Sequence, residues 1–184
     1  MSASGLDVFD RTVETTHVWL NEICDEIGPD KQLAWKVLST VLHKLRDRLT
    51  INLAAHLGAQ LPLLIRGVYY DQFEPGKMPS GFRSREEFVA DVAKWLSDSR
   101  PVDPEKAVRA VFGVLSRHIS EGQCHKVRDS LPKGLRQMWD SGSTSHEHEA
   151  ARARHDERQP PERRDDPREE RTDEPLILTE AQAV

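Results

Sequence analysis

The sequence is short of the residues that mark secreted, membrane and metal-binding proteins. Its 184 residues include only two cysteines, Cys24 and Cys124, which lie far apart in the chain. Two such thiols are typical of a reducing cytoplasm and do not form a disulfide framework or a structural zinc motif. The first residues lack the basic stretch and apolar run of a secretory signal, and no apolar run is long enough to cross a bilayer. We therefore expect a cytoplasmic protein without membrane contact.

An excess of positive charge is also missing. The chain has 26 Lys and Arg residues against 31 Asp and Glu residues. Residues 141–184 hold seven arginines and 12 acidic residues, which leaves residues 1–140 with 19 charges of each sign. A neutral body gives no electrostatic reason to bind nucleic acid. The prediction is that nucleic acid is not a partner.

Motifs for catalysis and cofactors are missing as well. The sequence has no glycine-rich phosphate loop and no recognisable set of nucleophile and base. His43 and Asp47 form one pair at helical spacing, whereas a protein metal site needs at least three ligands. His56 has no carboxylate or second histidine at helical spacing, so we interpret it as structural. No metal and no cofactor are expected.

What the sequence does contain is a repeat. Residues 37–66 align with residues 107–136 without a gap, at a shift of 70 residues. Such a match predicts two copies of one helical unit. The matched pairs are Leu38 with Val108, Val41 with Val111, Leu42 with Phe112, Leu45 with Leu115, Leu49 with Ile119, Thr50 with Ser120, Leu57 with Val127, Leu61 with Leu131, Pro62 with Pro132, Ile65 with Leu135 and Arg66 with Arg136.

The apolar residues predict helices throughout the body. They recur at spacings of three and four, and no segment alternates apolar and polar residues over the length of a strand. Thr50 and Ser120 are placed to cap a short helix in each copy, and the last helix is expected to end near Trp139. The predicted fold is a single all-α bundle of about eight helices in residues 1–140. Its two repeated halves cover about 6–70 and 84–139.

Composition changes after this body. Residues 141–174 are rich in charge and predict a disordered linker, in which His146 and His148 are solvated rather than metal-binding. Residues 175–184 form a short apolar peptide. Its Leu176, Ile177 and Leu178 are a candidate motif for docking to an unknown protein partner. The equal alternative is a frayed apolar end without a partner, which includes an end that folds back on its own body.

Residues 48–70, RLTINLAAHLGAQLPLLIRGVYY, resemble a bacterial family known as domain of unknown function 2267. The second Leu-Pro pair, with Arg136 and Trp139 after it, and the aromatic positions Phe88 and Trp95 fit the same family. The resemblance covers roughly residues 8–139. It implies a compact all-helical domain and brings no assigned activity, cofactor or catalytic residue.

Five side chains are candidates for ligand binding. Arg66 and Arg136 follow the two Leu-Pro pairs, where they could grip an anion bidentately or brace the carbonyl end of a neighbouring helix. Tyr69, Tyr70 and Trp139 could line a cleft between the copies or close the bottom of the core. Because both copies keep the arginine, we favour a role in building the repeat.

Two classes of function follow. The first is a non-catalytic binding or scaffolding protein whose body and terminal peptide each present a surface, with homo-oligomers left open. The alternative is a small-molecule sensor or enzyme with a pocket between the copies, formed by the two arginines and the aromatic residues. The missing catalytic motifs favour the first class and make an enzyme the less expected outcome.

Overall fold

The computed structural model describes residues 5–79 and 82–141, and in these residues every regular element is helical. The elements are α1 (Asp7–Ile27), α2 (Lys31–Arg48), α3 (Ile51–Gln60), α4 (Leu63–Tyr70), the short 3-10 turn η1 (Pro75–Lys77), α5 (Arg85–Leu96), α6 (Pro104–His118) and α7 (Glu121–Asp129). A last helix covers residues 133–141. The predicted all-α fold of about eight helices is confirmed. The last helix continues two residues past its expected end at Trp139.

Polar side chains cap the beginnings of three helices. Asp30 does so for α2, Ser84 for α5 and Asp103 for α6, and each accepts a hydrogen bond from backbone N–H groups of the first turn. The first-turn N–H groups have no partner within their own helix, so these caps fix where each helix begins. The signal is local, and it is therefore readable from sequence.

The matched positions Thr50 and Ser120 behave differently. Thr50 Oγ1 accepts from the backbone N–H of Leu53 at 3.4 Å and caps α3. Ser120 occupies the same position before α7, but its hydroxyl makes no capping hydrogen bond. Its backbone N–H instead donates to Gln60 Oε1 at 2.8 Å. The predicted cap is confirmed for Thr50 and wrong for Ser120, because a side chain from the end of α3 holds this end of α7.

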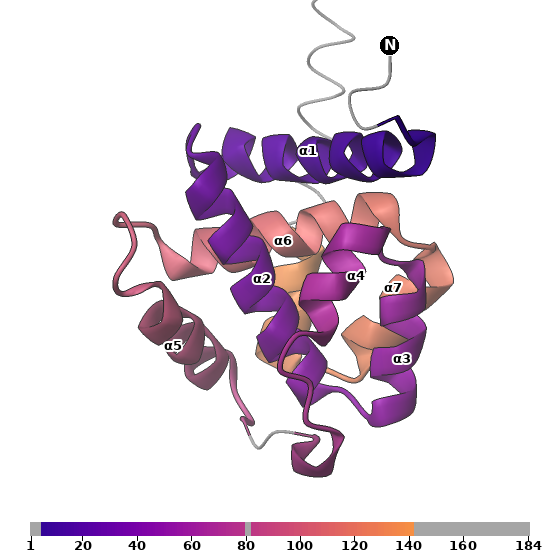
Figure 1. Cartoon of the computed structure of the whole chain (residues 1–184). Helices are drawn as coiled ribbons and strands as arrows, with labels where there is room; N and C mark the ends of the chain where they lie inside the picture. The colour runs from indigo at the N-terminus through magenta and orange to yellow at the C-terminus, as the bar shows by residue number, and fades with distance from the viewer. Residues whose placement is uncertain (1–4, 80–81, 142–184) are drawn as a thin grey trace, which may run out of the picture.

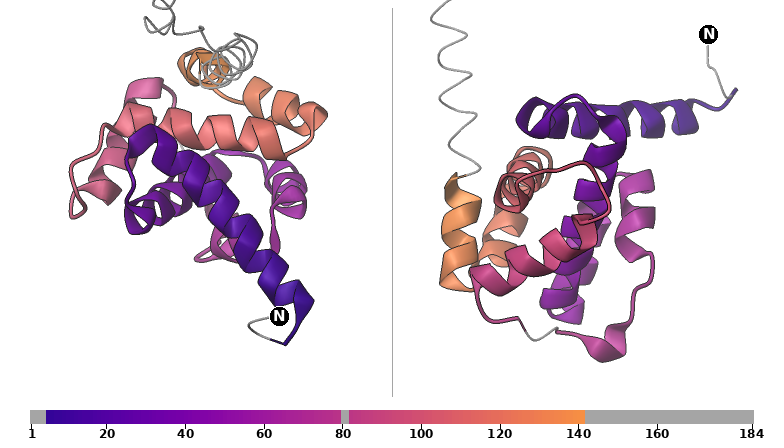
Figure 2. Two further views of the ribbon diagram at one scale, coloured as in Figure 1. Left: turned by 90° about the horizontal axis from the view of Figure 1, so that it is seen from above. Right: turned by 90° about the vertical axis from the view of Figure 1, so that its left-hand side faces the viewer.

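Helices α2 and α6 form the centre of the bundle. At the top of Figure 1, helix α1 lies over one end of α2 and along one side of α6, and α5 packs on both α2 and α6 from another side. Helix α3 packs against α7, and α4 packs against α1 and α2. Figure 2 shows that the N-terminal end of α1 projects beyond the other helices. Part of this helix therefore has no body beneath it.

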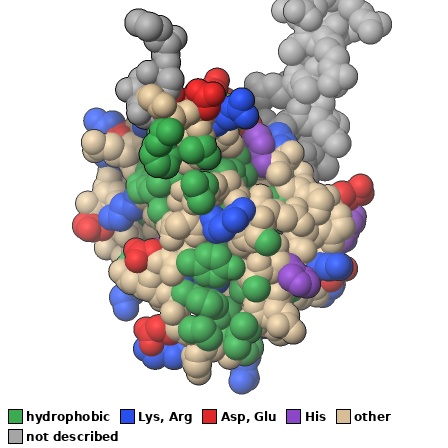
Figure 3. Space-filling view, turned by 45° about the vertical axis from the view of Figure 1, so that its right-hand side comes forward, with side chains coloured by type: hydrophobic (Ala, Val, Ile, Leu, Met, Phe, Trp, Pro, Cys, Tyr) green, Lys and Arg blue, Asp and Glu red, His purple; other side chains and the backbone are tan. Residues whose placement is uncertain are grey.

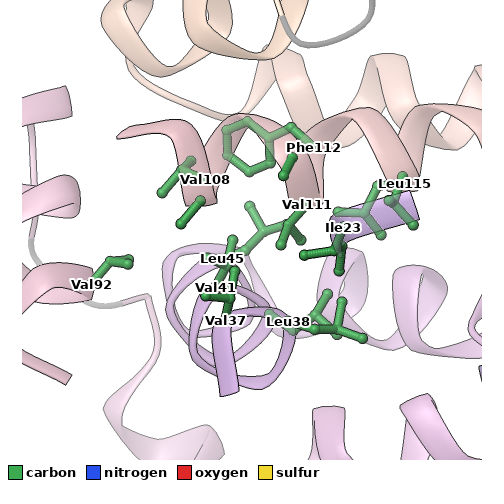
Figure 4. Packing of buried hydrophobic residues seen from close by; sticks show 14 of the residues in the cluster. Ile23, Val37, Leu38, Val41, Leu45, Val92, Val108, Val111, Phe112 and Leu115 are labelled. Atoms are coloured by element: carbon green, nitrogen blue, oxygen red, sulfur yellow. The ribbon is translucent and has the colours of Figure 1, made fainter. Parts of the chain in front are cut away.

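Side chains from both halves make one core, which extends in sequence from Trp19 to Trp139. In Figure 4 the apolar residues of α2 and α6 point toward one another, with Ile23 of α1 beside them. Both members of every matched apolar pair are buried. Matched residues also lie on helices that correspond in order, α2 with α6 and α3 with α7. The duplication behind this correspondence stays an inference from the sequence.

One buried charge belongs to the framework. The Arg46 side chain is 3% exposed, and its guanidinium donates to the backbone carbonyls of Tyr69 and, at 2.8 Å, Asp71. It also donates to Asp47 Oδ1 at 2.8 Å and lies 5.2 Å from the centre of the Phe73 ring. Carbonyls at a helix C-terminus lack partners within the helix. Arg46 therefore ties the end of α4 to α2.

Part of what the sequence predicts lies outside the described residues. This applies to the linker 141–174 after its first residue and to the apolar peptide 175–184 with Leu176, Ile177 and Leu178. In the residues that are described, no helix combines the length and the apolar character needed to cross a membrane.

Candidate functional site

Exposed apolar side chains concentrate at one place on the described surface. Six of its nine exposed large hydrophobic residues belong to the beginning of α1 or the beginning of α4. Figure 3 shows hydrophobic side chains gathered on the face below the N-terminal end of α1. The six residues are Leu6, Val8, Phe9, Val13, Leu63 and Leu64.

The sequence of α1 explains half of this surface. Its apolar positions follow one face of the helix at spacings of three and four. Leu20 and Ile23 lie on that face and are buried, whereas Phe9 is 52% exposed and Val13 is 48% exposed. The apolar face continues over two turns that the rest of the body does not cover (Figure 2).

A groove runs between α1 and α4. It has a volume of about 580 Å³ and is lined by Phe9, Thr12, Val13, Leu63, Leu64, Gly67, Val68 and Asp71. We call it the α1–α4 groove. Two adjoining hollows of about 490 and 300 Å³ share lining residues with it and extend along α1 from Asp7 to Leu20. At 1.5 Å per residue, the three together follow about 20 Å of α1.

The groove offers mainly apolar contact. Its polar groups lie toward its ends, with Asp71 in the groove itself and Arg11 in an adjoining hollow. The side of α4 that faces the core is held in place, because Arg46 binds the carbonyl of Asp71 at 2.8 Å. A small-molecule site encloses most of its ligand. Walls as exposed as Phe9 and Leu63 suit a peptide or a helix instead.

Arg66 braces a neighbouring helix end. Its Nη2 donates to the carbonyls of Ala59 at 2.9 Å and Leu61 at 2.8 Å, and its Nε donates to Leu61 at 3.2 Å. These carbonyls close the C-terminal end of α3, where a cation is favourable. These hydrogen bonds correspond to bracing, which is one of the two roles that the sequence left open for Arg66. Arg136, at the matched position, is exposed.

Tyr69 and Trp139 lie inside the core. The Tyr69 hydroxyl donates to the carbonyl of Ala54 at 2.9 Å, and burial raises the pKa of Tyr69, which keeps the hydroxyl protonated. The indole of Trp139 stacks on Phe112 with ring centres 4.5 Å apart, and its Nε1 donates to Ser116 Oγ at 2.8 Å. Both aromatic residues therefore fill space between helices.

The five candidate residues lie on two helices. Arg66, Tyr69 and Tyr70 lie on α4, whereas Arg136 and Trp139 lie on the helix 133–141. Tyr70 is half-buried and packs edge-on against Tyr69 and Phe73. None of the five lines the α1–α4 groove. Their role in ligand binding stays a prediction, and the groove is a surface that the sequence analysis did not single out.

The surroundings of the two cysteines and of two histidines bear on whether they could act as nucleophiles or bases. Burial raises the pKa of the Cys24 and Cys124 thiols, which disfavours the reactive thiolate. His43 Nε2 lies 2.6 Å from the carbonyl oxygen of Val68, and His56 is exposed on α3. No three His, Cys, Asp or Glu side chains gather as metal ligands in residues 5–79 and 82–141.

Comparison with known families gives one match. The profile of the family described as uncharacterized conserved protein (DUF2267) matches residues 16–138. The chain belongs to the DUF2267 family. The resemblance seen in the sequence is thereby confirmed, and no curated protein matches the chain.

The DUF2267 match divides the groove. Leu63 and Leu64 of α4 lie inside residues 16–138, whereas Phe9 and Val13 of α1 precede them. Residues 175–184 lie beyond the other end of the match. One wall of the groove therefore lies within the matched residues, and the match begins partway along α1, the helix that supplies the other wall.

Proposed function

We propose that this DUF2267 protein is a non-catalytic binding protein, and that its α1–α4 groove takes an apolar peptide of a protein partner. The observation that carries the proposal is the gathering of six exposed apolar side chains on two adjacent helices. Contiguous apolar patches on a protein surface mark interaction sites, because covering them releases roughly 25 cal/mol per Å² of apolar area.

The shape of the groove supports a peptide rather than a sheet partner. Both walls are helices, so the groove offers no free strand edge. Recognition then depends on side chains that fit between Phe9 and Leu64. The groove and its two adjoining hollows, which together follow about 20 Å of α1, accommodate some three to four turns of helix or about six extended residues.

A second class of function has weaker support. A sensor or enzyme with a pocket between the copies needs Arg66 and Arg136 to face one ligand. The donors of Arg66 are directed at the carbonyls of Ala59 and Leu61 instead. The free thiols Cys24 and Cys124 support the bacterial, cytoplasmic setting that we propose for the binding protein.

The test is a selection of displayed random peptides on the full chain. Leu176, Ile177 and Leu178 are each replaced by Asp, so that the chain's own apolar peptide cannot compete. We expect enriched peptides with several large apolar residues, and at least tenfold weaker binding after Leu64→Glu. Ile51→Glu is the matched control, because Ile51 is an equally exposed apolar residue on α3.

Two results would overturn the proposed function. One is a selection that enriches no peptide above an unrelated protein. The other is a set of enriched peptides that bind the Leu64→Glu and Ile51→Glu variants equally well. Sedimentation of the same samples identifies a second copy of the chain as occupant, because its mass would then rise with concentration.

A further inference from the structure

We propose that the α1–α4 groove is covered by the chain's own apolar segment, residues 175–184, so that the protein occludes its own binding surface. This inference rests on the proposed function and names the first occupant of the same groove. A partner then has to displace the segment before it can bind. The segment and the groove belong to the same chain, so the segment regulates the access of a partner to the groove.

The chemistry of the segment fits the groove. Residues 142–174 contain no Leu, Ile, Val, Met, Phe, Tyr or Trp, and the segment then begins with Pro175-Leu176-Ile177-Leu178. Four extended residues span about 13 Å, which is shorter than the roughly 20 Å of α1 that the groove and its two adjoining hollows follow together. The segment is apolar and follows a long polar stretch, and the described residues leave the groove apolar and exposed. Contact between the two would remove both from water.

The length of the connecting chain is compatible with a contact inside one molecule. A random coil of 33 residues, the number between 141 and 175, would have a root-mean-square span of about 30 Å. A tether of this kind gives an effective concentration of about 1 mM. A segment that binds with a separate Kd of about 0.1 mM would then occupy the groove for about nine-tenths of the time.

The test uses a fluorescein-labelled peptide of residues 173–184 and fluorescence anisotropy. It is titrated with the full chain and with the chain that carries Leu176→Asp, Ile177→Asp and Leu178→Asp. We expect the variant to bind the peptide and the unaltered chain to bind it about tenfold more weakly. Adding Leu64→Glu to the variant abolishes binding, whereas adding the control Ile51→Glu does not.

Each other outcome overturns the inference. Equal binding to both chains means that the segment does not occupy the groove, and no binding to either means that it does not fit. Binding that survives Leu64→Glu places the segment elsewhere. If the sedimentation mass of the protein rises with protein concentration, and the Asp replacements reverse this rise, the segment comes from a second copy of the chain. The peptide selection on the Asp variant stands independently of these results, so the proposed function can survive them.

Discussion

The two halves of the body bring side chains together at the same pairs of positions and use different chemistry there. In the first half the Arg46 guanidinium donates to the backbone carbonyl of Tyr69. Seventy residues further on, the Ser116 hydroxyl accepts from the indole N–H of Trp139 at 2.8 Å. A charged clamp in one half thus corresponds to a neutral hydrogen bond in the other. The matched positions bring two side chains into contact, and the residue types determine which interaction they form.

A second pair of positions shows the same contrast. The Tyr70 ring lies over Gly58 so closely that a Cβ there would be 2.7 Å from Cζ of the ring. At the matched positions, Arg128 forms an ion pair with Asp140 at 3.1 Å. Close packing in the first half is replaced by a partly exposed ion pair in the second, which is worth little stability.

The outer faces of the halves differ most. Leu63 and Leu64, which line the groove, align with Lys133 and Gly134. A Cβ on Gly134 would lie 2.9 Å from Cβ of Arg85, so the glycine lets α5 approach the last helix closely. The first half carries leucine at this place and leaves an apolar groove. Both halves contribute to the core, and the exposed leucines of the proposed binding surface occur only in the first half.

The largest expected effect is the difference in stability cost between losing the Arg46 contact and losing the Ser116 contact. Arg46→Met leaves the carbonyls of Tyr69 and Asp71 without their donor, and we expect a loss of about 3 kcal/mol in the free energy of unfolding. Ser116→Ala removes one neutral acceptor from Trp139 and should cost about 1 kcal/mol. Urea unfolding of both variants measures the difference.

Arg46→Lys is the control for charge alone. A lysine keeps the charge but not the planar fork that reaches two carbonyls, so it should recover less than half of the loss. A cost for Arg46→Met no greater than that for Ser116→Ala would remove the distinction between the halves.

Local signals made much of the fold predictable. Helices α3 and α4 have the bounds that Thr50, Pro62 and the apolar spacing predict, because caps and prolines act on the nearest turn. The charge of Arg46 at the end of α2 gives no such signal. Its burial follows from where the end of α4 lies, which is a tertiary property. The same holds for Ser120, whose surroundings include Gln60 of another helix.

The candidate site was harder to predict for a related reason. Phe9 and Val13 follow the spacing of a buried face, and only the length of α1 beyond the body leaves them exposed. A usable signal was present in the repeat. Where Leu64 of one copy aligns with Gly134 of the other, an apolar side chain is not required by the shared framework. Such mismatches point to a surface with another use.

The next prediction compares the contributions of the two matched arginines to stability. Arg66→Met removes hydrogen bonds to the carbonyls of Ala59 and Leu61 and should cost about 1–2 kcal/mol. Arg136→Met changes an exposed side chain and should cost less than about 0.5 kcal/mol. Thermal unfolding with and without phosphate measures both variants, and phosphate is expected to leave the midpoint unchanged. A phosphate-dependent rise that is lost in Arg66→Met would instead support the sensor alternative.

The smallest effect concerns the two helix starts. Thr50→Ala removes the acceptor for the N–H of Leu53 and should cost about 0.5–1 kcal/mol, at the low end for caps because the bond is 3.4 Å long and exposed. Ser120→Ala should cost close to nothing, since its hydroxyl makes no capping bond and its N–H keeps Gln60 as partner. Gln60→Ala should then destabilise the protein more than Ser120→Ala does, although Gln60 lies in the other half. Equal costs for Thr50→Ala and Ser120→Ala would mean that both copies use the same cap, and that this end of α7 does not depend on α3.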